Sequence, residues 1–277
     1  MRNVRLKAYS ALLVVVVVWV SVISLQDNLS PVMNEISLDG KGAEYEQLKI
    51  AFITDMHFQN DEADFARYEN ILSMLIDVKP DIILLGGDYI DMDAEDIESL
   101  RPKVISALDR LAVIAPTYGV FGNHELYTGE LSWYQGVQQS KIRFMYNEIE
   151  EINVNGSLIC LRGLGDFFTD RYKSIPFPDD CDGLKVTVTH DPYVTEIDPE
   201  GGLYLAGHTH CGQIVLPLIG APWTPTRASK EYHCGLGYRD GRYWITSAGI
   251  GTTSIPFRLG TQSGFEVISV YRSGLSK

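Results

Sequence analysis

Short apolar runs bounded by turn residues recur along the chain, and they predict a series of buried strands. The runs cover residues 48–53, 81–85, 117–121, 185–189 and 202–206. A helix is expected between the first two runs, because apolar side chains repeat there at helical spacing: Phe65, Tyr68, Ile71, Leu72 and Leu75. A second helix is expected to start near Pro102, since proline suits the first turn of a helix.

Hairpin signals appear in the second half of the chain. Residues 152–160 surround an Asn155-Gly156 turn, and residues 238–246 surround Asp240-Gly241. Both dipeptides suit the two-residue loops of β-hairpins. With a last strand expected over residues 265–271, the pattern predicts a mixed α/β (α+β) domain.

The first 46 residues have a different hydropathy pattern. Residues 1–7 are a basic flank, and residues 8–25 form an apolar run of about 18 residues, the lower limit for a membrane-spanning helix. No Ala-x-Ala cleavage pattern is present, so an uncleaved anchor is favoured over a signal segment. By the positive-inside rule, the N-terminus stays cytoplasmic and the domain faces outward. Polar and turn residues over 26–46 predict a linker to a domain over 47–277.

Composition narrows the range of partners and cofactors. A chain of 277 residues with 45% hydrophobic content can bury one large core. The net charge of −13 argues against nucleic acid, whose binders carry a basic surface. Cysteine spacing argues against a structural zinc site, because no close C-x-x-C pair occurs among Cys160, Cys181, Cys211 and Cys234. Three disulfide pairings and free thiols both remain open.

Potential metal ligands follow five of the predicted strands. Five of the six histidines stand there, and the full set of side chains is Asp55, His57, Asp88, Asp91, Asn123, His124, His190, His208 and His210. Because α/β sheets bind ligands at the carboxyl ends of their strands, we expect these side chains to meet at one sheet edge. Imidazole and carboxylate without thiolate suit Mn²⁺, Fe or Zn²⁺. The donors outnumber what one ion needs, so we expect two ions about 3.5–4 Å apart, bridged by a carboxylate.

Five blocks in a fixed order carry a family resemblance: Asp55-Met56-His57, Gly87-Asp88-Tyr89-Ile90-Asp91, Gly122-Asn123-His124-Glu125, His190 and Gly207-His208-Thr209-His210. The set resembles the calcineurin-like metallophosphoesterases. The resemblance implies a two-sheet β-sandwich flanked by helices and a dinuclear metal site, with Mn²⁺ expected ahead of Fe or Zn²⁺. The last block, extended to Gln213, and the N-terminal anchor are similar to a bacterial membrane-associated phosphodiesterase branch. That branch includes enzymes acting on UDP-2,3-diacylglucosamine, and it usually carries Gly where Cys211 stands.

The resemblance also implies a role for each matching residue. Asp55, His57 and His210 would hold the first metal, Asn123, His190 and His208 the second, and Asp88 would bridge them. A hydroxide shared by the ions would attack phosphorus, with Asn123 helping to stabilise the phosphoryl charge. His124 would protonate the leaving group, and Asp91 would hold its imidazole. Glu125 would give local support, and Asp166 is a weaker candidate.

The substrate is less visible in the sequence. Residues 214–223 are apolar and are interrupted by Pro and Gly. They predict either a buried strand and loop or an apolar lip for acyl chains, joined there by Phe167 and Phe168. We expect hydrolysis of phosphodiester or pyrophosphate bonds at the bacterial cytoplasmic membrane, with a lipid-linked or nucleotide-lipid substrate as one option. A phosphomonoesterase or nucleotidase, and a non-catalytic metal-binding scaffold, are the alternatives. The native metal and the oligomeric state stay open.

Overall fold

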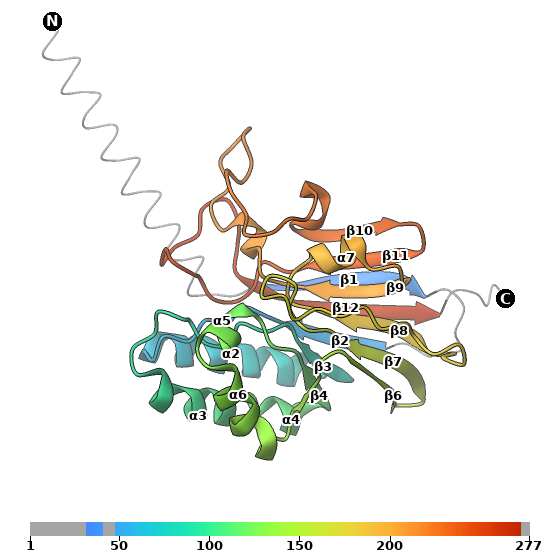
Figure 1. Ribbon diagram of the computed structural model, residues 1–277, viewed down its shortest axis with the longest axis horizontal. Helices are drawn as coiled ribbons and strands as arrows, with labels where there is room; N and C mark the ends of the chain where they lie inside the picture. The colour runs from blue at the N-terminus through green and yellow to red at the C-terminus, as the bar shows by residue number, and fades with distance from the viewer. Residues whose placement is uncertain (1–31, 41–47, 273–277) are drawn as a thin grey trace, which may run out of the picture.

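The protein is a sandwich of two six-stranded sheets (Figure 1). The computed structural model describes residues 32–40 and 48–272. The first sheet has the order β1-β12-β2-β3-β4-β5, and the second has the order β10-β11-β9-β8-β7-β6. The predicted two-sheet α/β architecture is therefore confirmed.

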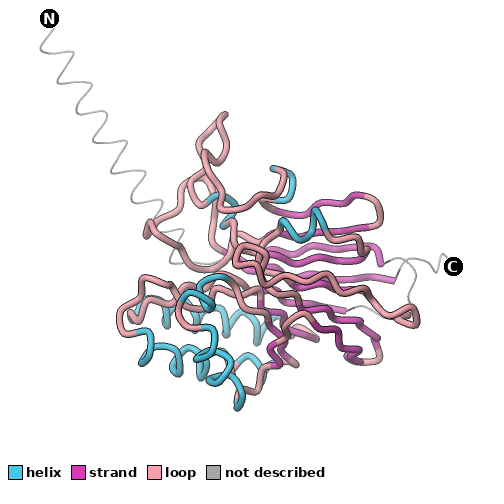
Figure 2. The backbone as a smooth tube through the Cα atoms, viewed as in Figure 1, coloured by secondary structure: helices cyan, strands magenta, loops and turns pink. Residues whose placement is uncertain are grey.

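The first sheet joins both ends of the described chain. Its strands are β1 (Val32–Gly40), β2 (Leu48–Ile53), β3 (Ile82–Leu85), β4 (Thr117–Gly119), β5 (Arg143–Phe144) and β12 (Gly264–Arg272). Between its strands lie α2 (Glu62–Val78), α3 (Ile97–Leu108), α4 (Leu111–Ile114), α5 (Asn123–Tyr127), α6 (Glu130–Gly136) and η1 (Val137–Gln139). Figure 2 shows that these helices gather on one side of the molecule, away from the second sheet.

The second sheet contains both predicted hairpins. Its strands are β6 (Glu148–Val154), β7 (Ser157–Gly163), β8 (Leu184–Val188), β9 (Gly202–Ala206), β10 (Gly235–Arg239) and β11 (Arg242–Thr246). β6 and β7 pair antiparallel around Asn155-Gly156, and β10 and β11 pair antiparallel around Asp240-Gly241. All four turn residues have positive φ, as a type I′ turn requires. Three short helices complete the elements of the described residues: α7 (Tyr193–Ile197), η2 (His210–Gly212) and η3 (Lys230–Tyr232).

The first sheet is buried on both faces, which explains its continuous apolar runs. On one face, Ala51 and Ile53 pack into a core with the helices. On the other, Ile50 and Phe52 pack against the second sheet, in a core shared with residues such as Leu203. Because successive strand residues point to opposite faces, a single short strand supplies both cores.

Two predicted boundaries are wrong. The helix expected to start near Pro102 begins at Ile97, because its buried apolar stripe already includes Leu100. Pro102 lies inside that helix, where it can donate no backbone hydrogen bond. The linker predicted over residues 26–46 contains β1, which pairs in parallel with β12. Residues 35–39 alternate polar and apolar, which is the pattern of a half-buried strand.

The predicted anchor, residues 8–25, lies outside the described residues, as does the basic flank 1–7. Within residues 32–40 and 48–272, no helix is long and apolar enough to cross a membrane. The open question of the cysteine pairing is answered by two disulfides, one between Cys160 and Cys181 and one between Cys211 and Cys234. None of the four is a free thiol.

Candidate metal centre

The residues expected at the site come together where the two sheets meet. β2, β3 and β4 of the first sheet and β8 and β9 of the second all end there. The expectation of a single sheet edge is therefore wrong. The two sheets are joined at this point by the carboxylate of Asp55, which accepts the backbone N–H of His208 at 3.0 Å. The cause is the face-to-face packing of the sheets, which brings strand ends of both to one end of the sandwich.

The backbone at this end is held in an unusual conformation. Asp55, His57, Asp88, His208 and His210 all have φ between 48° and 67°. Residues other than glycine seldom adopt this left-handed backbone conformation. Such outliers gather at functional sites, where surrounding packing holds them in place. Here they turn the chain sharply after each strand.

Two glycines leave space for the carboxylates. A Cβ atom at Gly122 would collide with Oδ1 of Asp88. A Cβ atom at Gly207 would collide with Oδ2 of Asp55. Any side chain at either position would displace a predicted metal ligand.

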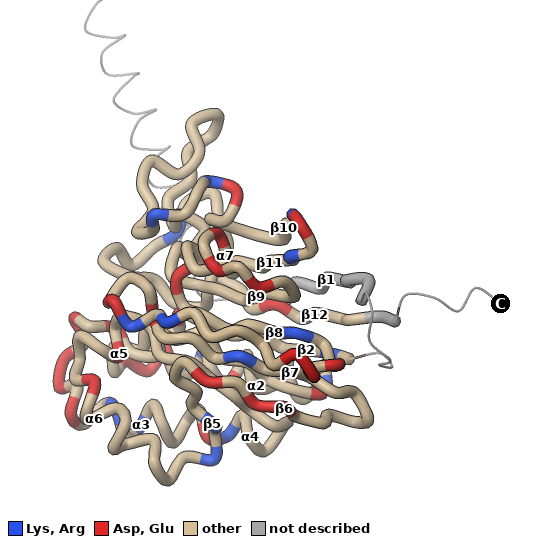
Figure 3. Tube along the Cα trace, turned by 45° about the vertical axis from the view of Figure 1, so that its right-hand side comes forward, with Lys and Arg blue, Asp and Glu red and all other residues tan. Residues whose placement is uncertain are grey.

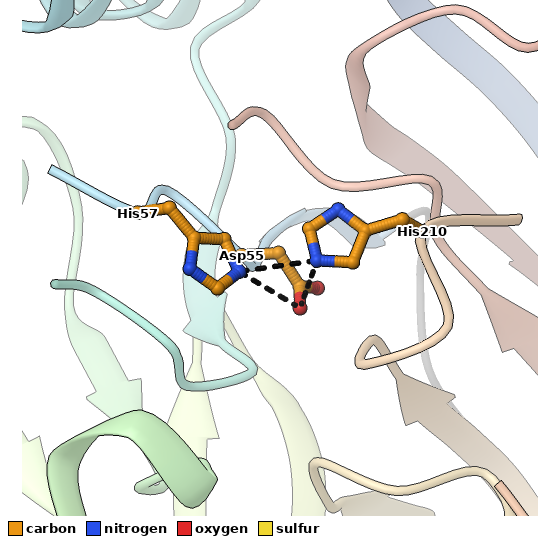
Figure 4. A group of neighbouring side chains, drawn as sticks. All are labelled: Asp55, His57 and His210. Carbon is orange, nitrogen blue, oxygen red and sulfur yellow. Dashed lines mark hydrogen bonds and ion pairs between the residues drawn. The ribbon is translucent and has the colours of Figure 1, made fainter. Parts of the chain in front are cut away.

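The first group of potential ligands contains Asp55, His57 and His210 (Figure 4). Nε2 of His57 and Nε2 of His210 lie 3.1 Å apart. Oδ1 of Asp55 lies 3.9 Å from the first nitrogen and 3.5 Å from the second. The hydroxyl of Thr54 donates to Oδ2 of Asp55 at 2.8 Å, and Oδ1, which accepts the N–H of His208, is the oxygen that faces the imidazoles.

The second group contains Asp88, His190 and His208, with Asn123 beside it. Nε2 of His190 lies 3.1 Å from Oδ2 of Asp88, 3.2 Å from Oδ1 of Asn123 and 3.2 Å from Nδ1 of His208. Oδ2 of Asp88 also lies 3.7 Å from Nε2 of His57. Asp88 therefore stands between the two groups, where the resemblance expects a bridging carboxylate.

Backbone carbonyls fix the tautomers of the second group. Nδ1 of His190 donates to the carbonyl of Gly86 at 2.7 Å, and Nε2 of His208 donates to the carbonyl of Pro225 at 2.6 Å. In neutral rings, the other two nitrogens then carry lone pairs, and these are the nitrogens that face each other at 3.2 Å. Two lone pairs at this distance repel unless a cation lies between them. Hydrogen bonds from the far ring nitrogen to carbonyls are also typical of histidines that bind metals.

The charges at the site favour a bound cation. Burial opposes ionisation of Asp88, but the imidazoles of His190 and His124 outweigh it and hold its pKa well below the ordinary value. Burial also opposes charge on His190, yet Asp88 raises its pKa well above the ordinary value. The site thus attracts positive charge to Nε2 of His190, where a metal ion can replace the proton. Burial, with nearby Arg258, lowers the pKa of His210, which keeps that ring neutral for ligation.

Glu125 does more than the expected local support. Its buried carboxylate accepts the backbone N–H groups of Asp88 at 2.8 Å, Tyr89 at 2.7 Å and Gly122 at 2.9 Å. It therefore fastens the turn after β3 to the turn after β4. Burial and the neighbouring Asp88 raise the pKa of Glu125 to about 7, and the bonds from Gly122 and Tyr89 oppose this.

The expected bond between Asp91 and His124 is not found in the described part of the chain. Nδ1 of His124 instead accepts the backbone N–H of Met92 at 2.9 Å. The carboxylate of Asp91 lies 3.8 Å from Nδ1 of His57 and accepts Gln59 Nε2 at 3.2 Å. The cause is the turn at residues 91–93, in which Asp91 accepts the N–H two residues on. Asp91 therefore faces the first group of ligands without a hydrogen bond to it.

Of two buried residues near the site, Arg258 was not singled out from the sequence and Asp166 was only a weaker candidate. Arg258 is fully buried, and its guanidinium donates to the carbonyls of His210, Ala248 and Gly251. It thus holds a metal-ligand loop against the turn after β11. Asp166 is also buried, and its Oδ2 accepts both the N–H and the hydroxyl of Thr169. A single charged residue far along the chain carries no pattern that would have revealed either contact.

Cavities lie on both sides of Trp223 beside the metal ligands. One, of about 240 Å³, is lined by Trp223 with His210, Ile214, Pro222 and Ile255. The other, of about 490 Å³, has an aromatic and charged wall that includes Tyr127, Phe167, Phe168, Trp223 and Arg227. The ring of Phe168 lies 4.9 Å from the ring of His208, which connects this second cavity to the ligands.

Comparison with known proteins gives matches over most of the described chain. A family model described as "Calcineurin-like phosphoesterase" matches residues 48–212. The chain is 31% identical over 209 residues to "Phosphodiesterase YaeI" of Escherichia coli (strain K12), covering 74% of this chain and 75% of that protein. It is 26% identical over 286 residues to a Bos taurus "Transmembrane protein with metallophosphoesterase domain", covering 94% of this chain and 62% of that protein.

Solved structures match at lower similarity. A 5'-nucleotidase precursor from Thermus thermophilus is 11% identical, with a TM-score of 0.47. The match covers 82% of this chain and 54% of that one. At this level the likeness carries no argument about substrate.

Proposed function

The chain belongs to the calcineurin-like phosphoesterase family and is a metal-dependent phosphoester hydrolase, and from that premise we propose that it hydrolyses phosphodiester or pyrophosphate bonds with two divalent metal ions. One observation carries the proposal. Nε2 of His190 and Nδ1 of His208 face each other at 3.2 Å, beside the carboxylate of Asp88, and a metal ion can replace the proton that Asp88 favours on His190. A cation satisfies all three acceptors at once.

Seven side chains have the chemistry to hold the ions. The first ion would bind Asp55, His57 and His210, the second would bind Asn123, His190 and His208, and Asp88 would serve both. Imidazole nitrogens with carboxylate and amide oxygens suit Mn²⁺, and they also suit Fe and Zn²⁺. When bound, the ions supply Lewis acidity and a nucleophile at neutral pH.

The proton for the leaving group would come from His124. In the neutral ring, Nδ1 accepts the N–H of Met92 and Nε2 carries the proton. To act as the acid, the ring must first take a second proton at Nδ1, which displaces the bond from Met92, and then donate from Nε2. That nitrogen lies 3.8 Å from Oδ2 of Asp88, on the side of the metal ligands. Burial lowers the pKa of His124, which makes the protonated ring a stronger acid. The side-chain amide of Asn123 would help to neutralise charge on the phosphoryl oxygens.

The cavities beside the metal ligands and the apolar N-terminal run together suggest a more specific substrate. We propose a diester that carries an apolar group, lipid-linked or nucleotide-lipid, hydrolysed by a domain anchored through residues 8–25 on the outer face of the bacterial cytoplasmic membrane. The cavity next to His210 has mostly apolar walls, which suits an acyl chain. Trp223→Ser is then expected to reduce hydrolysis of a lipid phosphodiester much more than hydrolysis of bis-p-nitrophenyl phosphate. Equal losses on both substrates would count against the apolar group.

The catalytic proposal is tested by Asn123→Ala and His124→Ala under saturating Mn²⁺, assayed on bis-p-nitrophenyl phosphate and on p-nitrophenyl phosphate. Asn153→Ala is the matched control, since Asn153 is an exposed asparagine in β6 whose Oδ1 accepts the N–H of Gly156 in the hairpin turn. We expect both site variants to lose activity and the control to keep it. Activity that survives both changes would contradict the proposal. A preference for the monoester would favour a phosphomonoesterase instead.

A further inference from the structure

Two loops beside the metal ligands expose large apolar side chains to solvent. We call this surface the apolar rim, and its members are Leu218, Ile219, Trp223, Ile255 and Phe257. Leu218 is fully exposed, at 108%, and Ile219 and Trp223 are more than 70% exposed. The rim holds five of the fourteen large hydrophobic residues that are exposed in the described part of the chain. Such clustering marks an interaction surface.

The rim is one surface because the two loops are bonded to each other. The N–H of Val215 donates to the carbonyl of Leu259, and the N–H of Leu259 donates to the carbonyl of Gln213. The side chain of Gln213 bonds the backbone of Thr253 and Ile255. At the tip, the N–H of Gly220 donates to the carbonyl of Leu216, so residues 216–220 form a closed turn that presents Leu218 outward. The tip protrudes at the top of the molecule in Figure 1.

Charge is absent from both loops. Residues 214–226 and 251–257 contain no Lys, Arg, Asp or Glu, although these residues make up 21% of the chain. Figure 3 shows the protruding loop without basic or acidic positions, while such positions are scattered along the rest of the described trace. A soluble face of this length would carry charges. The rim is therefore suited to an apolar environment.

The described chain begins at the same end of the sandwich as the rim. Val32, the first residue of β1, pairs with Gly264, whose N–H donates to the carbonyl of Gly249. A Cβ atom at Gly249 would lie 2.6 Å from Cβ of Asp55, so this backbone borders the metal ligands. Only residues 26–31 separate Val32 from the apolar run at 8–25, and they reach at most about 25 Å when extended.

We propose that the apolar rim lies in the surface of the lipid bilayer and turns the metal centre toward the lipid. The short connection to residues 8–25 brings this end of the domain to the membrane, and the uncharged rim enters the region between headgroups and acyl chains. The net charge of −13 opposes adsorption to anionic lipid, so the contact is apolar. This surface goes beyond the proposed hydrolysis, since it concerns where the site faces and not which bond it cleaves.

Fluorescence quenching by brominated lipid tests the proposal on the full chain. The protein is reconstituted into nanodiscs of phosphatidylcholine with or without bromine on the acyl chains, in a Trp19→Phe background that removes the tryptophan of the apolar run. Trp133 and Trp244 are buried in the protein, so Trp223 is the rim reporter. We expect bromine to reduce the emission, and we expect this reduction to be lost in Trp223→Phe. Added salt or anionic lipid should not strengthen the quenching.

A matched pair of double variants locates the contact. Leu218→Ser with Ile219→Ser is expected to weaken the quenching of Trp223, whereas Ile76→Ser with Val113→Ser, two exposed positions on α2 and α4, is expected to leave it unchanged. Equal emission in both lipids, or equal effects of both pairs, would overturn the proposal. Rim-dependent self-association in sedimentation, without quenching, would point to a second copy and would overturn it too. Hydrolysis of bis-p-nitrophenyl phosphate, measured on the same samples, reports separately on the proposed function.

Discussion

Replacing Glu125 with Gln removes a carboxylate that ties two turns of the site together. The side chain accepts three backbone N–H groups at 2.7–2.9 Å, one oxygen bonding Asp88 and Gly122 and the other bonding Tyr89. An amide nitrogen can only donate, so at least one of these N–H groups loses its acceptor in the variant. Each buried donor left unpaired costs about 1–3 kcal/mol. We therefore expect a loss of about 2–5 kcal/mol in the free energy of unfolding.

Equilibrium urea unfolding of the full chain in detergent micelles measures this loss. With EDTA, the measurement isolates the two turns from metal binding. With Mn²⁺, the wild type should gain stability from ligation, and Glu125→Gln should gain less, because the turn that positions Asp88 has shifted. Glu98→Gln is the matched control, since the Glu98 side chain is 76% exposed and its ion pair in the described part of the chain is with Arg101.

The reasoning would be refuted by either of two results. One is a loss in EDTA below about 1 kcal/mol, which is the scale of an exposed ion pair. The other is an unchanged gain from Mn²⁺, which would mean that Glu125 does not position Asp88.

Three further changes test other contacts of the structure. Asp91→Asn should weaken Mn²⁺ binding, because Asp91 faces His57; unchanged Mn²⁺ affinity in isothermal titration calorimetry would contradict this. Burial raises the pKa of Glu266 to about 7, so the folded state holds this proton more tightly, and stability should fall as the pH rises from about 4.5 through 7. Glu266→Gln should lack that fall, worth about 2–3 kcal/mol, when urea unfolding is compared at pH 5 and pH 8; parallel pH dependence in both proteins would be the adverse result. Cys211→Ser with Cys234→Ser should lower Mn²⁺ affinity, because the bond holds the segment next to His210; equal affinity would show that the disulfide does not support the site.

The sequence predicted the strand ends well because the signal is local. Apolar runs ending in His, Asp or Asn mark where β2, β3, β4, β8 and β9 stop, and those side chains do lie together. The same pattern could not show that two sheets contribute, because strand pairing is a long-range property. It also missed β1, whose alternating residues pair with a strand at the far end of the chain.

The hydrogen bonds and neighbours that orient the metal ligands were the least predictable part of the site. The carbonyls of Gly86 and Pro225 fix the tautomers of His190 and His208, and a backbone carbonyl leaves no trace in residue identity. The family resemblance assigned Asp91 to His124, but the turn of the chain places its carboxylate 3.8 Å from Nδ1 of His57. Side-chain type predicts what can be bound, whereas the partner depends on backbone geometry.

Metal content is the most direct test of the central claim that two ions share Asp88. The full chain and its Asp88→Asn variant are saturated with Mn²⁺, freed of excess by gel filtration and analysed by plasma mass spectrometry. The account predicts about two Mn²⁺ per chain in the wild type and less than one in Asp88→Asn, since both groups of ligands lose a shared carboxylate. A wild type that holds a single ion, or an Asp88→Asn variant that still holds two, would contradict it.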